Sequence, residues 1–174
     1  MSLALTKQIA TFDFNCFSRD LNQLLDYIWS THFPDVSCKN EIVIRYSYPW
    51  KRRLGLIRMA LDESSSLIGI NSLLQHPEVP EAVLITTVAH ELCHYAHGFG
   101  SPLPQLYEHP HANNVINLEL EKRHLSDHAR KCDEWIDKAW FPFYDRQRNS
   151  GWIGIPGTRK STHQRPMLVH RQTR

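Results

Sequence analysis

The sequence predicts a small α+β domain with an N-terminal helix, a three-stranded antiparallel sheet and several later helices. Two observations lead to this fold class. Hydrophobic residues recur at helical spacing near the N-terminus and again after residue 80, whereas the stretch between them is rich in β-branched and aromatic residues. With 174 residues, 41% hydrophobic and 22% charged, the chain has the size and composition of one globular domain with a tail.

The first helix is expected over about residues 15–31, with Ser18 as its cap and Pro34 just beyond its end. Its apolar positions follow the helical period: Phe17, Leu21, Leu24, Leu25, Ile28 and Trp29.

Three strands are expected next, over residues 41–48, 54–61 and 66–71, with a turn at 62–65 between the last two. The segment 49–53 reads Pro-Trp-Lys-Arg-Arg. We interpret it as the solvated end of a hairpin between the first two strands, with a binding patch as the alternative.

The most informative stretch, residues 85–98, reads ITTVAHELCHYAHG and contains H-E-x-x-H at His90, Glu91 and His94. Its helix is expected over about residues 80–97, because apolar residues precede the motif and glycines follow it. Residues four apart share a helix face, so the two histidines can bind one zinc ion. Glu91 then acts as general base on a water that the metal activates. The alternative is a metal-free core helix.

A catalytic zinc site usually has three protein ligands, so a third must come from outside the motif. His97 shares the helix face but lies seven residues beyond the first histidine, about 10 Å along the axis, which is too far for convergence on one ion. His109 and His111 both lie at the start of the next expected helix. We favour His111, because Val115 and Leu118 would continue its inward face. His109 would then hold it in place or bind substrate.

Other ligand arrangements are less suitable. Glu119 and Glu121 are carboxylate alternatives on the following helix, but the two clustered histidines before it fit better. The metzincin pattern would need glycine and histidine three and six residues after His94, where this chain has His97 and Gly100. Candidate donors to the oxyanion of a peptide substrate are Tyr95, Tyr107, His97 and His109.

Two further helices are expected after the motif. The first runs over about residues 110–123, with Val115, Leu118 and Leu120 facing inward. The second runs over about residues 126–140, with Ser126 as its cap.

Charge is unevenly distributed along the chain. Residues 1–145 contain 13 Lys and Arg against 18 Asp and Glu, and residues 146–174 contain 7 basic residues and no acidic one, which together give the net charge of +2. The hydrophobic pattern also fails after Pro142. We therefore expect a domain over 1–145 and a flexible, disordered basic tail over 146–174, which contacts DNA or only aids solubility.

The sequence also predicts the compartment. No run of eighteen apolar residues exists, so no membrane helix is expected, and the N-terminus does not resemble a secretory signal. The cysteines form no CxxC pair: Cys16, Cys38, Cys93 and Cys132. We expect free thiols in a cytoplasmic protein, with the nucleoid or nucleus as alternatives, and not a secreted one.

The order of these features resembles the SprT-like metalloprotease domain of the Spartan/SprT family, over roughly residues 14–140. Its most specific elements are HELCH and HANNV, at residues 90–94 and 111–115. The resemblance implies a zincin-like domain in which the motif histidines and His111 bind one zinc ion and Glu91 is the catalytic base. Family members are DNA-associated proteases, and some cleave proteins crosslinked to DNA. Bacterial members often end in a cysteine zinc ribbon, for which this chain lacks the cysteines.

We therefore expect a zinc-dependent endopeptidase whose substrate is a protein, including proteins associated with DNA. The alternative is a nucleic-acid-binding protein in which the zinc site is structural or catalytically idle.

Overall fold

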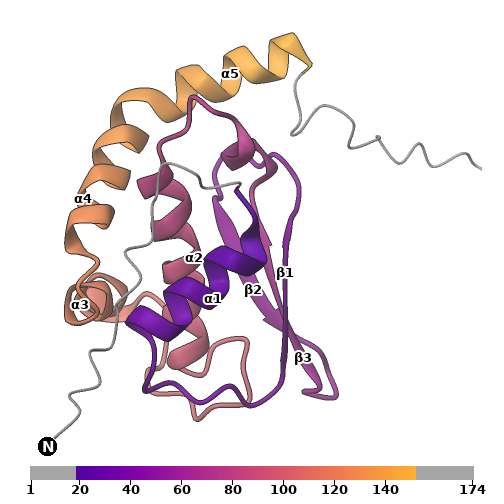
Figure 1. Ribbon diagram of the computed structural model, residues 1–174, viewed down its shortest axis with the longest axis vertical. Helices are drawn as coiled ribbons and strands as arrows, with labels where there is room; N and C mark the ends of the chain where they lie inside the picture. The colour runs from indigo at the N-terminus through magenta and orange to yellow at the C-terminus, as the bar shows by residue number, and fades with distance from the viewer. Residues whose placement is uncertain (1–18, 152–174) are drawn as a thin grey trace, which may run out of the picture.

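The computed structural model describes residues 19–151 and has the expected α+β fold class, with one sheet and several helices (Figure 1). The helices and strands of the N-terminal half are α1 (Leu21–His32), β1 (Glu41–Tyr46), β2 (Gly55–Met59), β3 (Ser65–Ile70) and the 3-10 helix η2 (Ser72–Gln75). Those of the C-terminal half are α2 (Glu81–Ala96), η3 (Ala112–Asn114), α3 (Val115–Lys122), α4 (Ser126–Trp135), η4 (Ile136–Trp140) and α5 (Phe141–Ser150).

The sheet is mixed, so the expectation of a wholly antiparallel sheet is wrong. Strand β3 lies in the middle, parallel to β1 and antiparallel to β2. The expected hairpin between β1 and β2 does not form, because the chain crosses past β3 and places β2 at the far edge. A buried amide holds this connection: Nδ2 of Asn71 donates to the carbonyls of Trp50 at 2.7 Å and Arg53 at 2.8 Å.

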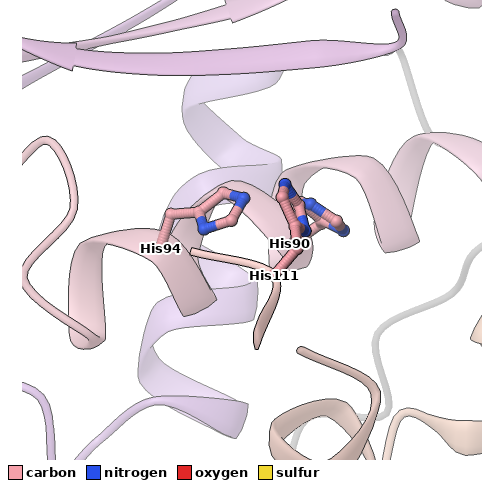
Figure 2. Close-up of side chains that lie close together, drawn as sticks. All are labelled: His90, His94 and His111. Carbon is pink, nitrogen blue, oxygen red and sulfur yellow. The ribbon is translucent and has the colours of Figure 1, made fainter. Parts of the chain in front are cut away.

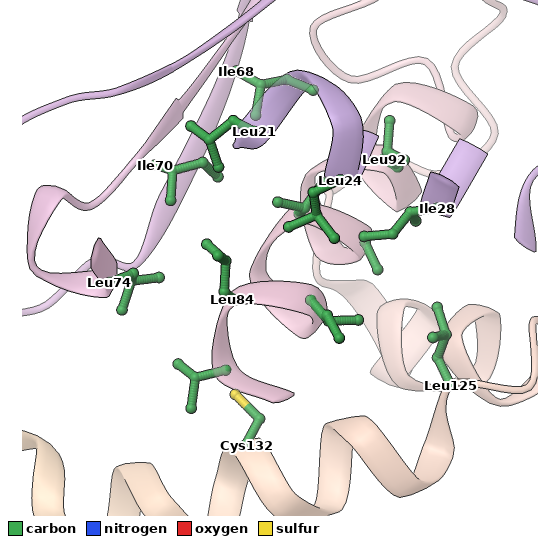
Figure 3. Close-up of a cluster of buried hydrophobic side chains, with 14 of the residues drawn as sticks. Leu21, Leu24, Ile28, Ile68, Ile70, Leu74, Leu84, Leu92, Leu125 and Cys132 are labelled. Atoms are coloured by element: carbon green, nitrogen blue, oxygen red, sulfur yellow. The ribbon is translucent and has the colours of Figure 1, made fainter. Parts of the chain in front are cut away.

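Helix α2 is the centre of the fold. It packs against α1, β2 and β3 and also against α3 and α4, so the sheet and the later helices lie on different sides of it (Figure 1). This position explains why its apolar residues are not confined to one stripe. Its side chains meet those of α1, β3 and α4 in one core (Figure 3), which includes Leu24, Ile28, Ile68, Leu84, Leu92 and Cys132.

The expected beginnings of two helices need correction. Helix α1 is capped by Asp20, whose carboxylate accepts hydrogen bonds from the N–H groups of Asn22 and Gln23. The expected cap Ser18 lies outside the described residues. Ser126 is the first residue of α4 and not its cap, since Leu125 occupies the cap position without a side-chain hydrogen bond.

The helix expected over 110–123 is shorter than predicted. Asn113 and Asn114 both have positive φ, at 49° and 61°, so a continuous helix cannot pass through them, and α3 begins only at Val115. As a result Leu118, which we expected to face inward, is 57% exposed, whereas Ile116 is buried.

The chain remains helical past the point where we expected the tail to begin. Pro142 lies in the first turn of α5, directly after the π-helical segment η4, and does not end the helical run. Helix α5 therefore continues to Ser150, and the indole of Trp140 just before it donates to the carbonyl of Lys51 at 2.8 Å. The rest of the predicted basic tail, from residue 152, lies outside the described residues.

The expectations about membrane helices and about the cysteines can be compared with the described part of the chain. Within residues 19–151, no helix combines the length and the apolar composition that crossing a membrane requires. The three cysteines in this range, Cys38, Cys93 and Cys132, are free thiols as expected. Cys16 lies outside it.

Candidate metal centre

The C-terminal half of α2 carries His90, Glu91 and His94, as the motif predicted. The histidines are four residues apart, so their rings lie on one face of the helix, with centroids 4.7 Å apart. His94 and Glu91 are buried, at 7% and 4% exposure, and His90 is partly buried. The helix thus presents a pair of imidazoles and a carboxylate at the edge of the core.

The loop after α2 brings the third histidine back to this face. Gly98 has φ of +80°, and a Cβ there would collide with the backbone of Pro104, so a glycine is required for the sharp reversal. The N–H of Leu106 then donates to the carbonyl of His97 at 3.0 Å. His111 follows in a turn ahead of η3, and its ring lies beside the other two (Figure 2).

The rings of His90, His94 and His111 lie close enough together to bind one ion. The centroid of His111 is 4.7 Å from that of His94 and 5.3 Å from that of His90. One ligand nitrogen from each ring can be chosen so that all lie within 4.8 Å of one another. Nitrogens bound to one tetrahedral zinc are about 3.4 Å apart, so a small movement of the side chains suffices. The group could therefore hold a metal ion.

The electrostatic setting of the two motif histidines favours the form that binds metal. Burial, with a smaller contribution from the nearby His111, lowers the pKa of His90 to about 4. Burial also lowers the pKa of His94 to about 3, with smaller contributions from the neighbouring histidines. Both imidazoles are thus neutral at pH 7. Nδ1 of His94 is buried and has no hydrogen-bond partner among the described residues, so no protein group competes for it.

The side chain of Glu91 extends from α2 toward the edge strand β2. Burial raises its pKa to about 8, an effect that the positive charge of Arg53 opposes. The strand approaches closely because residue 55 is glycine: a Cβ at Gly55 would lie 2.5 Å from Oε1 of Glu91 and 3.0 Å from Cγ2 of Thr87. The carboxylate therefore occupies the space that a side chain at this strand position would fill.

These groups face a common cavity of about 880 Å³. One wall is the edge strand with the residues before it, from Arg52 to Ile57, and another is formed by α3 and α4. His90, Glu91, His94 and His111 all line it. A cavity of this size is large enough for a segment of polypeptide, and the buried carboxylate and the imidazoles open into it together.

The alternative ligands are placed elsewhere. The side chain of His109 is 74% exposed and lies 3.8 Å from the carboxylate of Glu108. His97 is buried at 2% exposure, with Nε2 3.6 Å from Glu119. Glu119 is itself paired with Arg123 at 2.7 Å. None of these groups belongs to the histidine cluster.

His111 joins the cluster for a different reason from the one that we gave. The helical periodicity through Leu118 is not realised, because the left-handed residues Asn113 and Asn114 separate His111 from α3. The position of His111 is set instead by the loop that begins at Gly98 and by the packing of α3 against α2.

The expected oxyanion donors do not line the cavity. The hydroxyl of the buried Tyr95 accepts a hydrogen bond from the N–H of Lys39 at 2.9 Å and donates to Asn40 at 3.0 Å, in the segment before β1. The ring of Tyr107 packs against His97, with centroids 4.9 Å apart. The cationic groups that do line the cavity are Arg52 and Arg53, which we had interpreted as part of a solvated turn.

One sequence signal points to this wall of the cavity. A glycine at the start of an expected strand, Gly55, marks a close approach of another group, which here is Glu91.

No protein-family model, no curated protein and no solved structure matches this chain.

Proposed function

We propose that this chain is a zinc-dependent endopeptidase of the SprT-like type. The observation that carries the proposal is the convergence of three histidines and one buried carboxylate on a single open cavity. A histidine cluster alone would suit a structural ion. A carboxylate beside that cluster, facing the same cavity but outside the ligand group, is the arrangement expected for metal-assisted hydrolysis.

Zinc is the metal that fits this donor set best. Three neutral imidazoles are a known ligand set of catalytic zinc, and they leave a fourth position for water or substrate. Bound there, the ion would lower the pKa of a water molecule and polarise the carbonyl of a peptide bond. His90, His94 and His111 would hold it.

Glu91 would act as the proton carrier of the reaction. Its carboxylate removes a proton from the attacking water and delivers it to the amine that leaves when the peptide bond breaks. A pKa raised by burial brings the carboxyl close to neutral pH, which suits a group that must both accept and release a proton. Gly55 lets the edge strand pass within contact distance, so that the carboxylate is confined to one position.

Loss of proteolysis in Glu91→Gln tests the proposal. The zinc-loaded full chain is incubated with a DNA-binding protein as substrate, alone or with single- or double-stranded DNA, with and without a chelator. Glu91→Gln should retain zinc, because Glu91 is not one of the three ligands. It should lose at least about 100-fold in activity, the usual contribution of a general base. The matched control is Glu81→Gln, the same change in the first turn of α2.

The outcomes separate the candidate functions. A fully active, zinc-loaded Glu91→Gln variant would refute the mechanism. Wild-type protein that binds zinc but cleaves nothing under any condition would favour the alternative of a nucleic-acid-binding protein with an idle zinc site. Cleavage that requires DNA would extend the proposal to DNA-associated substrates, for which the basic segment after α5 is the predicted contact.

A further inference from the structure

Arg53 is a cation of the cavity that forms no ion pair with a carboxylate among the described residues. It lines the same cavity as Glu91 and the three histidines. Its neighbour Lys51 is neutralised by Asp145 at 2.9 Å, and Arg146 by Glu78. Within residues 19–151, no carboxylate forms an ion pair with the Arg53 guanidinium: the ring of Trp50 lies 5.9 Å away, and the positive charge of Arg53 acts on the carboxyl of Glu91 only through the cavity. Its charge is therefore available to an anion that enters the cavity.

The backbone of Arg53 is firmly positioned. Its carbonyl accepts a hydrogen bond from Nδ2 of Asn71, a side chain with 0% exposure. The N–H of Asn71 donates in turn to Leu54 at 2.7 Å. A further hydrogen bond, from Trp140 to the carbonyl of Lys51, ties the same loop to the C-terminal helices. These hydrogen bonds hold the backbone from which the Arg53 side chain reaches the cavity.

We propose that Arg53 binds a carboxylate of the substrate, so that the cavity prefers acidic protein segments. The identity of the ligand as a peptide rests on the proposed function. A guanidinium pairs with a carboxylate through two parallel hydrogen bonds, which gives direction as well as attraction. Arg52, which lines the cavity next to it, adds a second positive charge at the same rim. The carboxylate comes from an acidic side chain or from the C-terminus of the substrate, and these two sources can be separated.

Peptide binding to the zinc-loaded Glu91→Gln chain tests this inference without requiring cleavage. Fluorescence anisotropy is measured with a labelled, amidated alanine–serine peptide that carries glutamates, with its glutamine counterpart, and with the glutamine peptide bearing a free C-terminus. The glutamate peptide should bind about fivefold tighter than its counterpart, the scale of a partly exposed ion pair, and less so at high salt. A preference for the free C-terminus instead would identify that carboxylate as the ligand.

Two second-site variants assign the effect to Arg53. In Arg53→Gln the preference should disappear, whereas zinc content and thermal stability stay unchanged because the side chain is exposed. The matched control is Arg58→Gln, which removes an exposed arginine from β2 that does not line the cavity. This control should keep the preference.

Several results would overturn the inference. It fails if no peptide binds, if the three peptides bind equally, or if Arg53→Gln retains the preference. A thymidine oligonucleotide is tested in the same binding assay. The inference also fails if Arg53→Gln weakens binding of this oligonucleotide but not of the glutamate peptide, because the ligand of Arg53 would then be nucleic acid. Cleavage by wild-type protein without an acidic preference would refute this inference and leave the peptidase intact. If the protein prefers acidic peptides but cleaves nothing, this inference stands and the proposed peptidase activity is refuted.

Discussion

Gly55→Ala should disable the site without disturbing the fold. The new Cβ would lie 2.5 Å from Oε1 of Glu91, and a normal contact of about 3.4 Å requires the carboxylate to move by about 1 Å. A displacement of that size at a reacting group costs on the order of 100-fold in rate. The backbone itself accepts alanine, since Gly55 is not among the glycines with positive φ.

The assay compares kcat/KM for a peptide substrate, zinc content and thermal stability in the two proteins. Gly55→Ala should bind zinc normally, since the three histidines are untouched, and lose about 100-fold in kcat/KM. Gly69→Ala is the matched control in the same sheet: its Cβ would lie 3.3 Å from Cγ of Leu56 and would not meet Glu91. Wild-type kcat/KM in a zinc-loaded Gly55→Ala variant would show that the position of Glu91 against β2 is irrelevant to the chemistry.

Three further predictions follow from the ligands, the buried carboxyl and the C-terminal segment. His111→Ala should weaken zinc binding by more than about 100-fold and His109→Ala by less than about tenfold, measured by competition with a chelator; equal losses would contradict the assignment of His111. In metal-free protein, the pKa of Glu91 is raised from 4.5 to about 8, so the folded state holds an extra proton between these values and its unfolding free energy falls as pH rises from 5 to 8. Glu91→Gln removes this loss, so denaturation should show a stability difference that widens over this range, and a constant difference would argue against the shift. Deletion of residues 152–174, which spares α5, should weaken DNA binding and its salt dependence but not peptide cleavage; unchanged DNA binding at every salt concentration would exclude this segment as the contact.

Local patterns in the sequence predicted the elements whose signals are local. The β-branched runs predicted three strands, and the apolar approach to H-E-x-x-H predicted α2 almost to its ends. The order β1-β3-β2 arises because the chain passes from β1 to the far edge of the sheet before β3 pairs between them. Nothing in residues 49–53 indicated this connection instead of a hairpin. The buried Asn71 that holds the connection reads in the sequence as an ordinary polar residue at the end of a strand.

In the site too, the residues on one helix were predictable from the sequence, whereas those brought in by loops were not. Two histidines and a glutamate on one helix follow from spacing alone, whereas His111 depends on a loop and on two asparagines with positive φ. Asparagine tolerates that conformation better than most residues, so the pair Asn113–Asn114 offered a signal for a break in the helix that the hydrophobic pattern concealed. Arg53 reaches the cavity only because β2 lies at the edge of the sheet.

The separation of the third histidine from the motif would couple the order of a surface loop to the proposed zinc ion. Every residue from Pro104 to His109 is exposed, so the core contributes little to fixing this part of the loop. An ion shared by His94 and His111 would close a ring of 18 residues, which would lower the entropy of the open chain by about 2.6 kcal/mol. Amide hydrogens in this loop should therefore exchange with solvent faster once zinc is withdrawn, while those in the middle of α2 remain protected. The loop would thus report the metal content of the protein in the absence of any substrate.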